Sequence, residues 1–331
     1  MRTNGDRRAL VIFPGALGDL VCLLPAIEAL ARRDCATRFD LMAAQTLARF
    51  FAGRSVFAAG HSIDRAEVTS LFADSDEELT QPRRFFGRFS RIYSFFASGN
   101  ASYRRHLALA CGGSASFHRF RPAYAGHVAA GYLAELGLTA EVGSPLAAAP
   151  GAVITQARIL PTGADFARSD EVLGAVGFER GRFVILMPGS GSRSKNWAAE
   201  NFAALAGAIF ERLPCAILLG PAEHPLKAVF EARGCVVLAG LELPVAAALL
   251  ASALAFVGND SGVSHMAAAL DVPGVVLFGP TEPARWAPLG RVTVIAQPAL
   301  AELDCSEVAG ALNAIIGEPI GARRPSSGLS R

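Results

Sequence analysis

Residues 254–279, LAFVGNDSGVSHMAAALDVPGVVLFG, contain a strand, a polar loop, a helix and a second strand in close succession. Leu254–Val257 and Gly274–Phe278 are short apolar runs of the kind that form buried strands. Ser261–Leu270 lies between them and has the length of a helix, with capping residue types at its start. A strand–helix–strand unit predicts parallel strands, and therefore an α/β fold.

The same alternation continues on both sides of this stretch. Further strands are expected at Ala9–Phe13, Arg38–Ala43, Ser55–Ala59, Phe183–Met187, Ala216–Leu219 and Cys235–Leu238, and further helices at Asp19–Arg33, Ala198–Leu213, Pro225–Arg233, Pro244–Ala251 and Glu302–Ile316. Ala, Pro and Gly accumulate at residues 144–152, which predicts a linker. We therefore expect two α/β domains, at residues 1–150 and 151–320, followed by a disordered tail at 321–331.

Composition limits the class of protein. The chain has 331 residues, of which 52% are apolar and 18% charged, enough for two globular cores. The net charge of +2 gives no indication of a nucleic-acid partner. Six cysteines without C-x-x-C spacing fit reduced cytosolic thiols. The N-terminal apolar run is too short for a signal peptide, and the longest uncharged stretch, Leu243–Asn259, is too short to span a bilayer. These features predict a cytoplasmic protein whose membrane contact is peripheral.

Several polar loops follow the predicted strands, and ligands of open α/β sheets bind beyond the carboxyl ends of strands. Residues 188–197, PGSGSRSKNW, place small residues before a cation, which is typical of an anion-binding loop. Lys195 is one of only two lysines against 29 arginines, which favours a specific role for its compact charge. Residues 258–265 open a helix whose N–H groups suit phosphate, although Asp260 and Ser261 as simple caps and His265 as a packed histidine fit equally well. Together with residues 278–286, which follow the next strand, these loops indicate a nucleotide diphosphate.

The loop Pro14–Asp19, PGALGD, follows the first strand. Its glycines permit a sharp turn and close approach of a ligand, and Asp19 then either caps the next helix or acts as a functional carboxylate. The loop is not the dinucleotide fingerprint G-x-G-x-x-G. The histidines of the chain are dispersed, so no metal site is predicted.

These segments resemble glycosyltransferase family 9, the ADP-heptose:lipopolysaccharide heptosyltransferases. The resemblance rests on residues 14–30, 188–206, 218–225 and 259–288, which occur in the family's order. It implies a GT-B architecture, with two Rossmann-like domains facing a central cleft. It also implies an inverting transfer, without a metal or other cofactor, of a heptose or related sugar from ADP-heptose.

The resemblance assigns roles to individual residues. Asp19 matches the general base that acts on the acceptor hydroxyl, and Lys195 matches the lysine that neutralises the donor phosphates. The implied donor nucleotide-binding residues are Ser190, Gly191, Lys195, Glu223, Asp260, Ser261, Gly262, Val263 and His265. Gly15, Ala16 and Gly18 are expected beside the acceptor. Phe13 stands where many relatives have a basic residue, which predicts altered acceptor or sugar recognition, and Asp271 stands where the family usually has glycine, a change that a helix end tolerates.

A basic and aromatic stretch, Gln81–Arg121, contains eight arginines and no acidic residue. Arginine pairs well with phosphate and carboxylate, so we assign Arg83, Arg84, Arg104 and Arg105 to an anionic glycolipid acceptor of the Kdo–lipid A or lipopolysaccharide-core type. The same composition suits the cytoplasmic face of the inner membrane, or a solvated surface over an aromatic core. It contains no known nucleic-acid-binding motif.

Two other functions fit the same architecture. A sugar-nucleotide epimerase would act without an acceptor and would need no basic acceptor surface. A non-catalytic protein could keep the nucleotide site alone, although the presence of both Asp19 and Lys195 argues against loss of catalysis.

Overall fold

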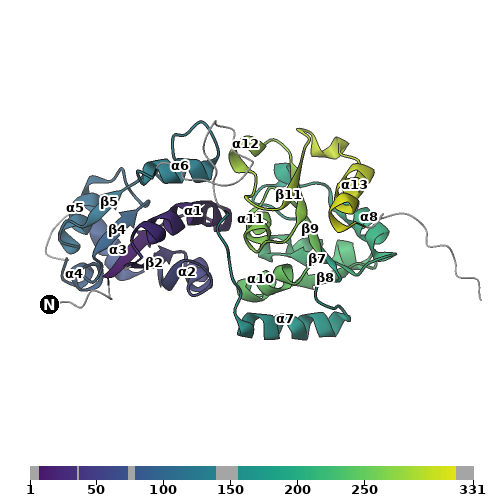
Figure 1. The fold of residues 1–331 in the computed structure, drawn as a ribbon, viewed down its shortest axis with the longest axis horizontal. Coiled ribbons are helices and arrows are strands. Elements are labelled where there is room, and N and C mark those ends of the chain that lie inside the picture. Colours follow the sequence, from purple (N-terminus) through teal and green to yellow (C-terminus); the bar gives the residue numbers. More distant parts are fainter. Residues whose placement is uncertain (1–6, 36, 74–78, 139–155, 318–331) are drawn as a thin grey trace, which may run out of the picture. The chain divides into compact units, whose positions relative to one another are not determined.

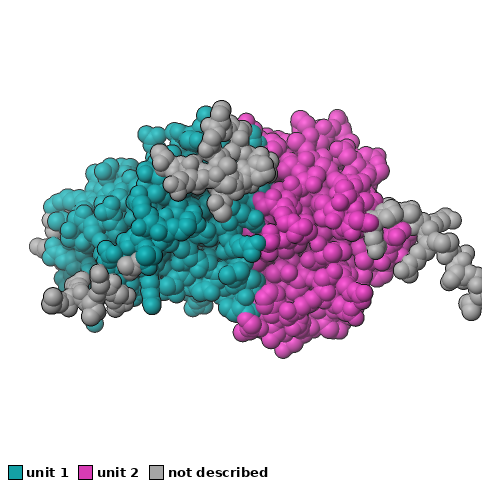
Figure 2. Space-filling view, in the orientation of Figure 1, with its two compact units in different colours: residues 1–162, 284–289 teal, residues 163–283, 290–331 magenta. Residues whose placement is uncertain are grey.

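The fold is described from a computed structural model over residues 7–35, 37–73, 79–138 and 156–317. The chain divides into two compact units (Figure 2). Unit 1 comprises residues 1–162 and 284–289, and unit 2 comprises residues 163–283 and 290–331. The expected linker at 144–152 and the expected tail at 321–331 lie outside the described residues.

Unit 1 is built on a five-stranded parallel sheet of order β3-β2-β1-β4-β5 (Figure 1). Its strands are β1 (Arg7–Ile12), β2 (Thr37–Ala43), β3 (Phe57–Ser62), β4 (Arg91–Ser94) and β5 (Ala115–Phe117). Its helical segments are α1 (Leu17–Arg33), α2 (Gln45–Phe51), α3 (Ala66–Thr69), η1 (Ser70–Phe72), α4 (Thr80–Phe86), α5 (Ala101–Ala110) and α6 (Val128–Glu135).

Alternate residues of β1 serve two cores, because successive side chains of a strand point to opposite faces. Leu10 and Ile12 pack into a cluster with Phe86 and Tyr103, from α4 and α5. On the other face α1 packs against α6. The loop after β1 therefore ends at the carboxyl edge of a sheet whose two faces are both covered.

Unit 2 contains a six-stranded parallel sheet of order β11-β10-β9-β6-β7-β8. The strands are β6 (Val184–Met187), β7 (Cys215–Leu219), β8 (Val236–Ala239), β9 (Ala255–Asn259), β10 (Gly274–Phe278) and β11 (Val292–Ala296). Every residue of β6, β7, β9 and β10 is buried, as in a parallel sheet covered on both faces. The chain runs outward from β6 to β8 and then returns to β9 beside β6, so β6 and β9 form a topological switch point.

The helical segments of unit 2 are α7 (Gly163–Val176), η3 (Arg193–Lys195), α8 (Ala199–Phe210), η4 (Pro221–Leu226), α9 (Lys227–Glu231), α10 (Leu243–Ala251), α11 (Gly262–Ala269), η5 (Leu300–Glu302) and α13 (Cys305–Ile316). The short helix α12 (Pro283–Trp286) begins at the last residue of unit 2 before the chain enters unit 1. Side chains of α8 and α13, including Phe202 and Val308, share one core with β6 and β9.

Some predicted boundaries are wrong. The helix expected at Glu302–Ile316 begins only at Cys305, where the Asp304 carboxylate accepts the Ser306 N–H and caps it. The helix expected at Pro225–Arg233 is a 3-10 segment followed by the short α9. Among the described helices, none combines the length and the apolar character that crossing a membrane requires.

Candidate functional site

An ion pair lies at the switch point of unit 2. Lys195 ends η3 in the loop that follows β6, and Asp260 follows β9 directly. The Lys195 Nζ atom lies 2.8 Å from Asp260 Oδ2, and the Thr281 hydroxyl, after β10, donates to the same oxygen at 2.7 Å. Loops from three neighbouring strands therefore meet at one carboxylate. Thr281 was not predicted as a site residue.

The two charges of this pair differ in exposure. The Asp260 side chain is 6% exposed, whereas that of Lys195 is 29% exposed. The carboxylate thus holds the ammonium group from the protein side and leaves it accessible on the other. The accessible side of the ammonium group can contact an anion. Because Asp260 already balances one charge, an anion that carries more than one negative charge competes best for this lysine.

Asn259 connects the loop after β6 to the end of β9 through hydrogen bonds of its side chain. It is fully buried, its Oδ1 accepts the Trp197 N–H at 3.1 Å, and its Nδ2 donates to the Pro188 carbonyl at 2.8 Å. Pro188 and Trp197 are the first and last residues of the predicted anion-binding loop, so Asn259 holds both of its ends. Asn259 lies in a quoted motif but was not predicted as a site residue, because its partners are 62 and 71 residues away in the chain.

The N-terminus of α11 adjoins Asp260. Ser261 is its N-cap, and its hydroxyl accepts the Ser264 N–H at 3.3 Å. Gly262 and Val263 are half-buried in the first turn, where backbone N–H groups lack intrahelical acceptors, whereas His265 is only 5% exposed. Of the predicted donor residues, Asp260 contacts the ammonium group of Lys195, and Ser261, Gly262 and Val263 follow it directly in the chain.

The loop Pro188–Asn196 is shaped by its own side chains. The Ser190 hydroxyl lies 2.6 Å from Asn196 Oδ1 and accepts the Ser192 N–H at 3.2 Å, while Gly191 is exposed. Glu223, in η4 after β7, lies against the start of this loop. A Cβ atom on Gly189 would lie 2.2 Å from Cδ of Glu223, so only glycine admits this carboxylate. The structure thus brings Glu223 to the same edge of the sheet as Ser190.

Asp19 lies in the first turn of α1 in unit 1. Its Oδ2 accepts the Ala16 N–H at 3.2 Å, and the side chain remains partly exposed. Gly15 is buried so tightly that an added Cβ would lie 2.4 Å from the Phe13 ring and 2.8 Å from Asp19 Cβ. Gly18 precedes Asp19 in the same turn. Asp19 is therefore held by its own helix start and still presents a carboxylate to solvent.

Phe13 is fully buried and belongs to an aromatic core below this loop. Its ring meets Phe95, Phe120 and Tyr132 edge-on at centroid distances of 5.6, 5.4 and 5.7 Å. Burial, and then the charge of Asp19, raise the pKa of Tyr132. Phe13 therefore offers no surface to a ligand, and the altered recognition expected from the missing basic residue stays a prediction.

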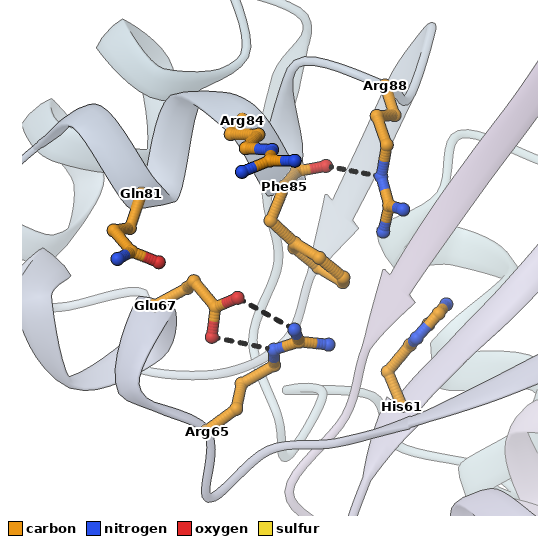
Figure 3. Close-up of a pocket in the computed structure, with 7 residues that line it drawn as sticks. All are labelled: His61, Arg65, Glu67, Gln81, Arg84, Phe85 and Arg88. Atoms are coloured by element: carbon orange, nitrogen blue, oxygen red, sulfur yellow. Dashed lines mark hydrogen bonds and ion pairs between the residues drawn. The ribbon is translucent and has the colours of Figure 1, made fainter.

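The four predicted acceptor arginines are exposed and lie on two helices that contact each other. Arg83 and Arg84 lie on α4, and Arg104 and Arg105 lie on α5. The Arg104 guanidinium stacks over Phe117 at 5.0 Å. Arg84 lines a hollow of about 660 Å³ together with His61, Arg65, Glu67, Gln81, Phe85 and Arg88, hereafter the α3–α4 hollow (Figure 3). Arg65 and His61 precede the basic stretch in sequence and were not predicted.

A metal site needs several donor side chains at one place. Within the parts of the chain that the structure describes, no group of three or more His, Cys, Asp or Glu side chains is arranged to hold a metal ion.

Comparison with known proteins gives a family match in the second half of the chain. Residues 156–312 match the model of glycosyltransferase family 9 (heptosyltransferase). Lipooligosaccharide heptosyltransferase 2 of Haemophilus ducreyi is 36% identical over 119 residues, which cover 31% of this chain and 32% of that protein. Lipopolysaccharide heptosyltransferase 3 of Escherichia coli K12 is 33% identical over 114 residues, covering 32% of this chain and 33% of that protein. The aligned part thus spans about a third of each curated relative.

Solved structures match over nearly the whole chain. The ADP-heptose lipopolysaccharide heptosyltransferase II of E. coli has a TM-score of 0.73 at 20% identity, covering 93% of this chain and 98% of that one. A family 9 glycosyltransferase of Veillonella parvula has a TM-score of 0.74 at 17% identity, with coverages of 95% and 99%. These likenesses and the two parallel sheets confirm the predicted α/β fold of GT-B type.

Proposed function

Because this chain belongs to glycosyltransferase family 9, we propose that it transfers a heptose or related sugar from an ADP-sugar to an anionic glycolipid of the lipopolysaccharide-core or Kdo–lipid A type. The observation that carries this proposal is the convergence of Lys195, Asp260 and Thr281 at the switch point of unit 2. Such points are where open α/β sheets bind nucleotides. The printed names of the relatives, all heptosyltransferases, support the transferred group.

In the proposed donor site the diphosphate lies between Lys195 and the N-terminus of α11. The ammonium group and the N–H groups of Gly262 and Val263 stabilise the charge that develops on the leaving ADP, so that no divalent cation is required. Ser190 and Gly191 border the phosphates, and Glu223 accepts hydrogen bonds from the ribose hydroxyls. Asp260 orients Lys195 and is itself anchored by Thr281.

On the acceptor side, Asp19 acts as the general base. Its carboxylate takes the proton of the acceptor hydroxyl while that oxygen attacks the anomeric carbon from the face opposite the departing ADP, which inverts the configuration. General base catalysis of this kind contributes about 10²- to 10⁴-fold. Gly15, Ala16 and Gly18 lie beside Asp19 and border the acceptor, and the arginines of α4 and α5 attract its anionic groups.

The proposed reaction takes place in the cytoplasm, at the inner membrane that carries the acceptor. An epimerase would instead convert the nucleotide sugar alone. Product formation that depends on an added lipopolysaccharide-core acceptor therefore separates the two functions.

Nucleotide binding tests the donor site directly. We expect ADP, in the absence of divalent metal, to bind more tightly than UDP or GDP in isothermal titration. Lys195→Ala should weaken ADP binding by about tenfold or more, because a charge-assisted contact to phosphate is lost. Lys227→Ala is the matched control, since the only other lysine of the chain pairs with Glu231 on α9.

The other outcomes of this titration are equally informative. A preference for UDP or GDP would retain the transferase fold and remove the heptosyl assignment. No binding of any of the three, or equal ADP affinity of the Lys195→Ala variant, would contradict the donor site.

A further inference from the structure

The α3–α4 hollow of unit 1 is organised around one aromatic ring. Phe85 is 5% exposed, and two guanidinium groups stack on it, that of Arg65 at 3.8 Å and that of Arg88 at 4.6 Å from the ring centroid. Arg88 also donates from Nε to the Phe85 carbonyl at 3.2 Å. Stacking and hydrogen bonding hold both cations at defined positions beside the hollow (Figure 3).

A carboxylate of the protein already occupies part of this cationic surface. Glu67 Oε2 accepts from Arg65 Nε at 2.9 Å, and Oε1 accepts from Arg65 Nη2 at 2.7 Å. The hydrogen bonds from Arg65 lower the pKa of Glu67, and the charges of Arg65 and Arg88 add to this effect. Glu67 is therefore ionised at neutral pH, and it makes the bidentate contact that an anionic ligand would make.

The charges around the hollow do not cancel. Below it, the fully buried Asp40 bonds to Arg8 and to His61 Nε2, the latter at 2.7 Å, so Arg8 is neutralised from within. Among the described residues no carboxylate pairs with Arg84 or Arg88. Three arginines and one glutamate are among the described residues that line the hollow, so within this set two guanidinium charges remain unbalanced.

We propose that the α3–α4 hollow binds a phosphate monoester, with Arg65, Arg84 and Arg88 as its contacts and Glu67 as an internal carboxylate that the phosphate displaces from Arg65. A phosphate monoester carries close to two negative charges at pH 7, which matches the unbalanced charge. A carboxylate carries one charge and gains less from the cationic surface, whereas repulsion from Glu67 opposes either anion. That the acceptor carries this phosphate rests on the proposed function, whereas the phosphate site itself does not.

Titration with inorganic phosphate and with acetate, at pH 7.5 and constant ionic strength, tests this proposal. We expect phosphate to bind more tightly than acetate. Glu67→Gln should raise the phosphate affinity about fivefold or more, because one unit of negative charge a few ångströms away is removed. Arg84→Gln should lower it by a similar factor. Glu242→Gln is the matched control, since Glu242 makes an equivalent ion pair of 2.8 Å with Arg168 in unit 2.

Equal affinities for phosphate and acetate, or a phosphate affinity that Glu67→Gln leaves unchanged or lowers, would overturn the proposal. So would phosphate binding that Arg84→Gln does not weaken, because the phosphate would then bind elsewhere. Vesicles with phosphatidic acid, compared with phosphatidylglycerol, distinguish a lipid-borne phosphate monoester from a soluble one, again through Arg84→Gln. Failure of Lys195-dependent ADP binding would end the proposed transferase function and leave the phosphate result unaffected.

Discussion

Asp271 follows the C-terminus of α11 with a φ of 65°, in the left-handed region that glycine adopts without cost. Its N–H donates to the Ala268 carbonyl at 2.9 Å, and the Val272 N–H donates to the Ala267 carbonyl at 3.2 Å, so the chain turns sharply here. The family's usual glycine at this point therefore has a conformational reason. Aspartate is tolerated because short polar side chains visit this region more readily than others do.

A substitution pair at this position separates conformation from side-chain contacts. Asp271→Gly should raise the free energy of unfolding by about 0.5–1 kcal/mol, because glycine has no Cβ atom that would strain the left-handed backbone conformation. Asp271→Ala should lower it by a similar amount. Denaturant unfolding of the variants measures both changes. A loss of stability in both would mean that contacts of the Asp271 side chain outweigh its backbone conformation.

At the scale of elements, the proposed donor site depends on how closely η4 approaches the loop after β6. Glu223 fills the space above Gly189, and a Cβ atom there would lie 2.4 Å from Glu223 Oε1. Gly189→Ala should therefore displace Glu223 and weaken ADP binding about tenfold or more, through loss of the proposed ribose contact. Gly207→Ala, in α8, is the control, because no atom lies within 4 Å of its added Cβ. Equal ADP affinities of the two variants would show that Glu223 does not contact the nucleotide.

The start of α6 makes unit 1 sensitive to pH. His127 Nδ1 accepts the Ala129 N–H at 3.2 Å, so Nε2 carries the proton and donates to the Ala287 carbonyl at 2.8 Å. Burial lowers the pKa of His127, and burial also lowers that of His118. In both cases the unfolded chain binds a proton at a higher pH than the folded chain does.

The contribution of these two histidines to the free energy of unfolding should therefore be complete above the ordinary histidine pKa of about 6.5 and should decrease as the pH falls below it. The slope is at most about 1.4 kcal/mol per pH unit for each histidine. His127→Gln keeps a donor for Ala287 and should flatten the decrease of the unfolding free energy between pH 7.5 and 5.5. His224→Gln, at an exposed position, should not. Parallel pH profiles of wild type and His127→Gln would contradict this assignment.

At the scale of the whole molecule, most interior strands and the edge strands β3 and β8 were predictable, whereas the edge strands β5 and β11 were not. The strands β6, β7, β9 and β10 are uninterrupted apolar runs because helices cover both faces of the sheet. The edge strand β5 has only three residues, and Thr293 interrupts the apolar residues of β11, so neither was predicted. The interior strand β4 was also missed, since it has only four residues and begins with arginine.

The residues of the candidate site also divide into those that the sequence predicted and those that it did not. Lys195 and Asp260 were predictable because each follows a recognisable strand, and parallel strands bring their carboxyl ends to one edge. Thr281 and Asn259 act through bonds to residues on neighbouring strands, which spacing along the chain does not reveal. The α3–α4 hollow was not predictable, because Arg65 joins the basic stretch only through packing of α3 against α4.

We propose that Asp19 activates an acceptor for transfer from an ADP-sugar held by unit 2. The most direct test measures ADP release from ADP-heptose in the presence of a lipopolysaccharide-core acceptor, for wild type, Asp19→Asn and the control Asp34→Asn. Asp34, at the other end of α1, pairs with Arg7 on the surface. We predict that Asp19→Asn lowers the turnover about 10²- to 10⁴-fold while ADP affinity stays unchanged, and that Asp34→Asn has no effect. Acceptor-dependent turnover that survives in Asp19→Asn would contradict the account.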